Sequence, residues 1–152
     1  MKISFDLDDT LIPANKDEFP TEVRSFIQKL FGVELIRKDT ISLLKKLKAQ
    51  GHKIGVYTTS YRSKSKIWFQ FYSYGFQLDF IINEKLNRKE ISKAKVYATK
   101  YPPAFGIDVH IDDSEGVGIE GEKYQFNAII IEKDDTNWCS KLENKISNFN
   151  YL

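Results

Sequence analysis

The sequence predicts an α/β protein with a three-layer, Rossmann-like fold, a parallel sheet with helices on both faces. Short runs rich in β-branched and aromatic residues alternate with segments of helical periodicity, which is typical of strands joined by helical crossovers. Three of the apolar runs stop at oxygen-bearing side chains, Asp6, Thr58 and Asp112. No repeat, linker or low-complexity tract interrupts the 152 residues, so one domain over 1–152 is expected.

In the first half of the chain, alternating apolar residues predict a strand over 3–7. Thr21 is expected to cap a helix that ends at Gly32. Its apolar positions at helical spacing are Val23, Phe26, Ile27, Leu30 and Phe31. A second helix has Ile41, Leu44 and Leu47 on one face and ends at Gly51, and a strand follows over 53–57.

The second half predicts a helix over 62–74, strands over 78–82, 108–111 and 128–131, and a last helix over 137–146. Residues 83–101 fit either a helix or a long crossover. Parallel strands end at a common edge, where open α/β sheets bind their ligands. The sequence therefore predicts that Asp6, Thr58 and Asp112 meet at one crevice.

Composition and charge narrow the class of protein. Hydrophobic residues make up 41% and charged residues 29%, which is ordinary for a globular domain. The net charge of +2, with bases and acids interspersed, disfavours nucleic acid as a partner. One cysteine permits no internal disulfide, and no run of 18 apolar residues or signal-like segment occurs. A cytoplasmic protein without a membrane partner is expected.

Residues 5–11 read Phe-Asp-Leu-Asp-Asp-Thr-Leu. Asp6 and Asp8 lie two apart where the strand leaves the sheet, so both can reach the same space, and a hard cation prefers such oxygens. A calcium loop of the EF-hand type is excluded, since Leu11 and Asp17 stand where it needs glycine and glutamate. Taken alone, this strand end fits a solvated loop equally well.

Two further runs carry polar residues. Residues 54–60, Ile-Gly-Val-Tyr-Thr-Thr-Ser, lead a strand into three hydroxyls before a helix, which makes either a phosphate cradle or a helix cap. Residues 109–113, Val-His-Ile-Asp-Asp, deliver Asp112 and Asp113 or form a turn. His110 alternates with apolar neighbours, so it is expected to be packed or hydrogen-bonded rather than a ligand.

In this order, the three motifs resemble those of the haloacid dehalogenase superfamily, over residues 5 to about 114. The resemblance implies that Asp6 is the nucleophile of an aspartyl-phosphate mechanism and that Asp8 is the general acid and base. Mg²⁺ would be held by Asp6, the backbone carbonyl of Asp8, Asp112 and Asp113. Thr58 would bind the phosphoryl group, with Thr59 as the alternative one residue on.

The resemblance also requires a lysine that screens the nucleophile and the phosphate. Lys100, followed by two prolines that are expected to fix an extended approach to the next strand, is the first choice, and Lys93 and Lys95 are the alternatives. Many relatives have another carboxylate a few positions after the last acidic pair. Here Glu115 stands too close to that pair to be a sure equivalent.

Little chain is left for a cap between residues 11 and 53, so the resemblance is to the small capless type. The expected function is that of a magnesium-dependent phosphatase, and its partner is a phosphorylated substrate of unknown identity. A lid borrowed from a neighbouring subunit would imply a homo-oligomer. The alternative is a domain of this fold that binds metal and phosphate for recognition or regulation, without turnover. A receiver domain is disfavoured, because the middle strand ends in Thr58 rather than an acid.

Overall fold

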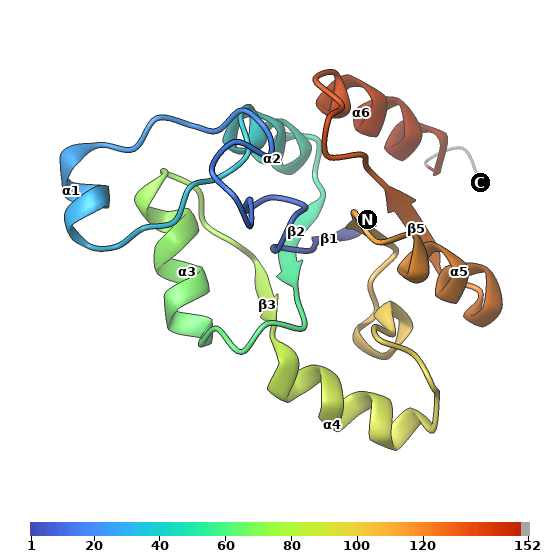
Figure 1. Cartoon of the computed structure of the whole chain (residues 1–152). Helices are drawn as coiled ribbons and strands as arrows, with labels where there is room; N and C mark the ends of the chain where they lie inside the picture. Colours follow the sequence, from blue (N-terminus) through green and yellow to red (C-terminus); the bar gives the residue numbers. More distant parts are fainter. Residues whose placement is uncertain (150–152) are drawn as a thin grey trace.

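The computed structural model describes residues 1–149 and has one parallel sheet of five strands, in the order β3-β2-β1-β4-β5 (Figure 1). The strands are β1 (Lys2–Phe5), β2 (Lys53–Tyr57), β3 (Phe80–Ile82), β4 (Val109–Asp112) and β5 (Asn127–Ile130). β1 lies in the middle and pairs in register with β2 on one side and β4 on the other. All the strands therefore end at the same edge of the sheet.

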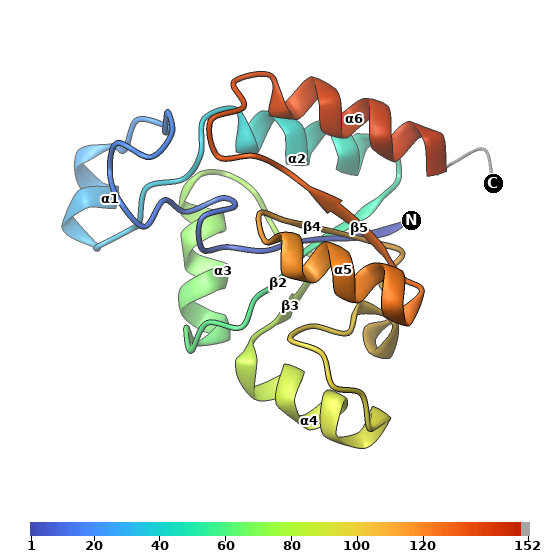
Figure 2. The same ribbon diagram turned by 45° about the vertical axis from the view of Figure 1, so that its right-hand side comes forward.

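Helices cover both faces of the sheet, which makes the predicted three layers (Figure 2). They are α1 (Phe26–Leu30), α2 (Thr40–Ala49), α3 (Lys64–Ser73), α4 (Glu84–Ala94), α5 (Glu115–Tyr124), α6 (Trp138–Phe149) and the 3₁₀ helix η1 (Pro102–Phe105). Between β1 and α2 the chain adds only α1 and its loops, so the described residues contain no substantial cap domain.

The two faces of the sheet carry different side chains. One face packs an apolar core against α2, α3 and α6, in which Ile3, Phe5 and Ile111 are almost fully buried. The opposite face has a smaller cluster around Tyr57, and it also carries the buried polar residues Ser4 and His110. Buried polar groups need partners. On this second face Ser4 and His110 hydrogen-bond to each other.

Glycine at position 55 of β2 has a packing reason. A Cβ there would lie 2.5 Å from the backbone oxygen of Phe80 on β3, closer than any real contact. The missing side chain therefore lets β3 and its aromatic ring close against β2. Substitution at Gly55 would displace the strand that leads directly to Thr58.

The helix predicted from Thr21 is wrong in its start. The helix begins at Phe26, after a capping box formed by Ser25 and Gln28, and spans only five residues. Its apolar side chains face solvent instead of the core, with Phe26 79% exposed. Helical spacing alone could not distinguish a buried face from an exposed one.

Other boundaries follow the predictions within a few residues, and the strand over 53–57 is confirmed as predicted. Residues 84–94 form α4 in the unassigned segment. Helix α5 was not anticipated, because Gly116, Gly118 and Gly121 lower its helical propensity. The prolines after Tyr101 begin η1 rather than fixing an extended approach. Within residues 1–149, none of the helices has the length and apolar character needed to cross a membrane.

Candidate functional site

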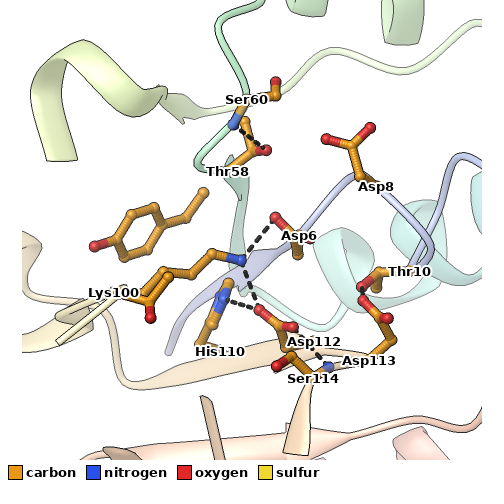
Figure 3. A network of polar contacts seen from close by, with 12 residues as sticks. Asp6, Asp8, Thr10, Thr58, Ser60, Lys100, His110, Asp112, Asp113 and Ser114 are labelled. Carbon is orange, nitrogen blue, oxygen red and sulfur yellow. Dashed lines mark hydrogen bonds and ion pairs between the residues drawn. The ribbon is translucent and has the colours of Figure 1, made fainter. Parts of the chain in front are cut away.

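The carboxyl ends of three adjacent strands bring the predicted residues to one place. Asp6 follows β1, Thr58 follows β2 and Asp112 ends β4. These strands are neighbours in the sheet, and Figure 3 shows the three side chains around a common space. The backbone N–H of Asp6 donates to Ile111 O at 2.8 Å, which extends the pairing of β1 with β4 up to the site.

A tight turn after β1 arranges the first motif. The N–H groups of Leu11 and Ile12 both donate to Leu7 O, at 2.9 and 2.7 Å, and Asp9 adopts a left-handed conformation with φ of 63°. Aspartate tolerates this region better than most residues. The turn directs the buried hydroxyl of Thr10 toward Asp113, to which it donates at 2.8 Å.

Lys100 lies between two of the carboxylates. Its Nζ is 2.7 Å from Asp6 Oδ1 and 2.6 Å from Asp112 Oδ2, and the residue is only 3% exposed. Burial alone would lower the pKa of Lys100, but these two carboxylates outweigh that effect and raise it, so the side chain is cationic. Lys93 pairs with Glu90 on the exposed face of α4, and Lys95 is exposed at the end of that helix.

Neighbouring contacts explain why Lys100 reaches the site. Tyr101 N–H donates to the hydroxyl of Tyr57 at 2.8 Å, and Asn87 Nδ2 donates to Thr99 O at 2.9 Å. The N–H groups of Thr99 and Lys100 donate to the carboxylate of Glu120 on α5. The segment is therefore fixed on both sides of Lys100 by β2, α4 and α5.

The carboxylates differ in their ease of ionisation. Burial raises the pKa of Asp6 to about 6, more than the charge of Lys100 lowers it. Burial would raise the pKa of Asp112 too, but the hydrogen bond from His110 and the charge of Lys100 lower it below the ordinary value. Burial raises the pKa of Asp113. Within residues 1–149, the three carboxyl groups of the site therefore have only one cationic side chain, Lys100, among them.

The residues present fit a divalent cation. Asp6, Asp112 and Asp113 each offer a carboxylate oxygen, and these oxygens lie within 4.8 Å of one another. The buried Oδ1 of Asp6 has the ammonium of Lys100 as its ion-pair partner at 2.7 Å. Three clustered carboxylates with only one ammonium of the described chain among them suit Mg²⁺, which prefers oxygen ligands. The Asp8 carboxylate lies outside this cluster, and the role of its carbonyl as a ligand stays a prediction.

His110 forms a hydrogen bond with Asp112. Its Nε2 lies 3.0 Å from Asp112 Oδ2, and its Nδ1 lies 2.8 Å from Ser4 Oγ. Burial and then the charge of Lys100 lower the pKa of His110 to about 4, so the ring is neutral at pH 7. Since the ionised Asp112 only accepts, Nε2 carries the proton and Nδ1 accepts from the Ser4 hydroxyl. The expectation of a packed, hydrogen-bonded histidine is confirmed.

Asp8 is held apart from the other acids by Arg62. The Nη1 of Arg62 lies 2.8 Å from Asp8 Oδ1 and 3.0 Å from Oδ2, while its Nε and Nη2 donate to the two oxygens of Glu34 at 2.9 Å. Glu34 is itself fixed, because its backbone N–H donates to Gln70 on α3. Arg62 therefore connects Asp8 to α3 through a bidentate pair.

The hydroxyl residues after β2 take different positions. Thr58 is buried, and its Oγ1 accepts from Ser60 N–H at 3.1 Å, which shapes the loop before α3. Thr59 instead lines a separate hollow of about 350 Å³, next to Asn87 and Thr99. Thr58 thus lies beside the space around Asp6. Thr59 lies beside the separate hollow, which residues of α4 also line.

Three contributors were not predicted from the sequence. Thr10 lies in the first motif but received no role, although a hydroxyl beside clustered acids was a usable signal. Ser4 could have been noticed as a polar residue inside an apolar strand. Glu34 gave no signal, since only the folded connector between α1 and α2 brings it to Arg62.

Fold and site together define a small three-layer α/β protein with an acidic cluster that can hold a metal ion at the carboxyl edge of its sheet. A scan against protein-family models finds no match to this chain, and neither does a search of curated proteins.

Proposed function

We propose that this protein is a magnesium-dependent phosphomonoester hydrolase that forms an aspartyl phosphate on Asp6, as the resemblance to the haloacid dehalogenase superfamily implies. The observation that supports this most directly is the position of Lys100, whose ammonium lies within 2.7 Å of both Asp6 and Asp112. Burying a cation between two acids at the end of parallel strands costs desolvation free energy, and buried charge clusters of this kind are typical of functional sites.

In the proposed reaction, a carboxylate oxygen of Asp6 attacks phosphorus, and the bond from phosphorus to the ester oxygen breaks. Asp8 donates a proton to the departing oxygen. Asp8 then accepts a proton from water as that water attacks the aspartyl phosphate, which releases phosphate and restores Asp6. Thr58 would bind a phosphoryl oxygen through its hydroxyl, and Lys100 would offset negative charge on Asp6 and the phosphate.

Asp6, Asp112 and Asp113, with the carbonyl of Asp8, would hold Mg²⁺. When bound, the ion supplies positive charge that allows a phosphate dianion to approach several carboxylates. Thr10 would keep Asp113 oriented, and His110 would keep Asp112 oriented, through the hydrogen bonds described above. A screen of sugar, nucleotide and peptide phosphates with magnesium, beside Asp6→Asn, tests the proposal.

Magnesium is expected to raise the melting temperature of the wild type by roughly 5–10 °C at a concentration a hundred times the dissociation constant, equivalent to about 2.7 kcal/mol. In Asp113→Asn the magnesium concentration for half of this shift should rise by roughly 10–100-fold, because one charged oxygen is lost. Differential scanning fluorimetry measures both. Asp17→Asn, a change at an exposed acid, is the matched control; an Asp113→Asn titration that overlays the wild type contradicts the ligand set.

Arg62→Ala is expected to lower kcat by roughly 10–100-fold with a smaller change in KM, because Asp8 loses the group that orients it. Steady-state kinetics with an aryl phosphate measure the two constants. Lys66→Ala is the matched control, since Lys66 lies 3.6 Å from Glu34 and makes no ion pair with Asp8. Equal losses in both variants would assign the effect to Glu34 and not to Asp8.

The second candidate, a domain that binds metal and phosphate without turnover, is favoured by one observation. Both carboxylate oxygens of Asp8 contact Arg62, which in turn pairs with Glu34, so Asp8 also has a structural role that does not require turnover. Calorimetry with magnesium and beryllium fluoride, beside the hydrolysis screen, separates the two functions. Binding with no hydrolysis across the panel supports the second.

A further inference from the structure

Helix α1 exposes its apolar residues and buries a polar one. The exposed residues are Phe26, Ile27, Leu30 and Phe31, and each is at least 65% exposed. The last three lie one, four and five residues after Phe26, so all four share one side of the helix. Gln28 is buried on the other side and donates to Ser73 O of α3 at 3.1 Å. Polar contacts between Gln28 and Ser73 thus fix α1 against α3. Figures 1 and 2 show α1 at the outer edge of the molecule, and its apolar side chains are exposed to solvent.

Helix α3 continues this apolar surface. Trp68, Phe69 and Tyr72 lie on one stripe of the helix and are 41%, 39% and 57% exposed. The rings of Trp68 and Tyr72 stack at 4.6 Å, and Phe69 meets Phe31 edge to face at 6.2 Å. The contact between the two phenylalanines joins both helices into one surface, called here the α1–α3 patch.

The patch has the size of a protein interface. Its seven side chains expose about four full side-chain surfaces, or about 800 Å² at roughly 150–250 Å² for each large side chain. Soluble monomers rarely expose an apolar patch above roughly 300–600 Å². A standard interface takes about 800 Å² from each partner, so one partner could cover the whole patch.

We propose that the α1–α3 patch is the interface of a two-fold homodimer, in which α1 of one copy packs on the α3 stripe of the other. The patch has two halves side by side, the α1 half with two phenylalanines and two aliphatic residues and the α3 half with three aromatic residues. A two-fold axis between them pairs each half with the other half of the second copy, so that both are buried at once. This inference rests on exposure and packing, and it holds whether or not the protein hydrolyses phosphoesters.

Charge at the edge of the patch sets the salt dependence of the dimer. Lys29 on α1 and Lys64 on α3 are exposed there. Two basic rims repel each other, and salt screens that repulsion. The homodimer should therefore become tighter as salt is added, whereas binding of an acidic partner on the same patch would become weaker.

Sedimentation velocity of the full chain tests the interface. The wild type is expected to dimerise with a dissociation constant of about 10 µM or below. Leu30→Lys, at a position 70% exposed, should raise that constant at least about tenfold without lowering the melting temperature. Ile119→Lys, at a position 67% exposed on α5 and outside the patch, should dimerise as the wild type does.

Tryptophan fluorescence gives a second measurement. The chain has two tryptophans, and Trp138 is 3% exposed, so a change with protein concentration reports on Trp68. Its emission is expected to shift to shorter wavelength as the dimer forms. The proposal is overturned by a single-chain mass at all concentrations up to about 100 µM, by an unchanged Leu30→Lys dimer, or by open-ended assembly.

Discussion

Asp6→Asn is expected to abolish magnesium-dependent hydrolysis of an aryl phosphate, with kcat/KM falling by at least about 10⁴-fold. The amide of asparagine fills nearly the same space but cannot form the aspartyl phosphate. Asp6 lies at the end of the central strand and 2.7 Å from Lys100, so little else should change around it. Initial rates of phosphate release, measured with saturating magnesium, give the comparison.

Folding has to be shown intact for this variant to be informative. Asp6→Asn removes a buried carboxylate whose pKa is raised by burial, so the metal-free variant should be no less stable than the wild type. Asp17→Asn is the matched control for an exposed acid and should keep full activity. Hydrolysis by Asp6→Asn at the wild-type rate would end the proposed mechanism.

Lys100→Met should give the second-largest effect and should be visible without any substrate. Methionine keeps an apolar stem but removes the ammonium between Asp6 and Asp112. Breaking a buried ion pair by removing one partner typically costs about 3–5 kcal/mol, because the remaining charges stay buried. The free energy of unfolding in urea should fall by about that amount, and kcat/KM should fall by roughly 10²–10³-fold.

Magnesium separates the electrostatic cause of this loss from a packing defect. If the cost comes from unscreened acids, magnesium should stabilise Lys100→Met more than it stabilises the wild type. Lys93→Met is the matched control, since Lys93 forms an exposed pair with Glu90 and should change stability by less than about 1 kcal/mol. A Lys100→Met protein as stable and active as the wild type would remove Lys100 from the site.

The edge of the sheet that gathers the polar residues was predictable from local patterns. Apolar runs ending at Asp6, Thr58 and Asp112 carry both the strand signal and the chemistry in a few adjacent residues, and parallel strands must end together. The sequence could not decide among three lysines, because the position of Lys100 depends on Tyr57, Asn87 and Glu120, all distant along the chain.

Two other features escaped prediction for different physical reasons. The glycines of α5 have low helical propensity, and Gly121 is placed where a Cβ would lie 2.9 Å from Phe126 O, so close packing outweighs propensity. The spacing around α1 correctly indicated an apolar helical face. Periodicity does not state what covers such a face, and its four side chains remain 65–79% exposed although Phe31 meets Phe69 edge to face.

The central position of β1 also governs the order in which the molecule assembles. Ile3 pairs with Ile54 on one side and with Val109 on the other, so the second pairing closes a far longer loop. Contacts between such distant residues form late, since loop closure must precede them. A partly folded chain that contains only the first three strands would hold Asp6 without Lys100 or Asp112. Competence to bind a divalent ion should therefore arise in a single late step of folding, when β4 joins the sheet.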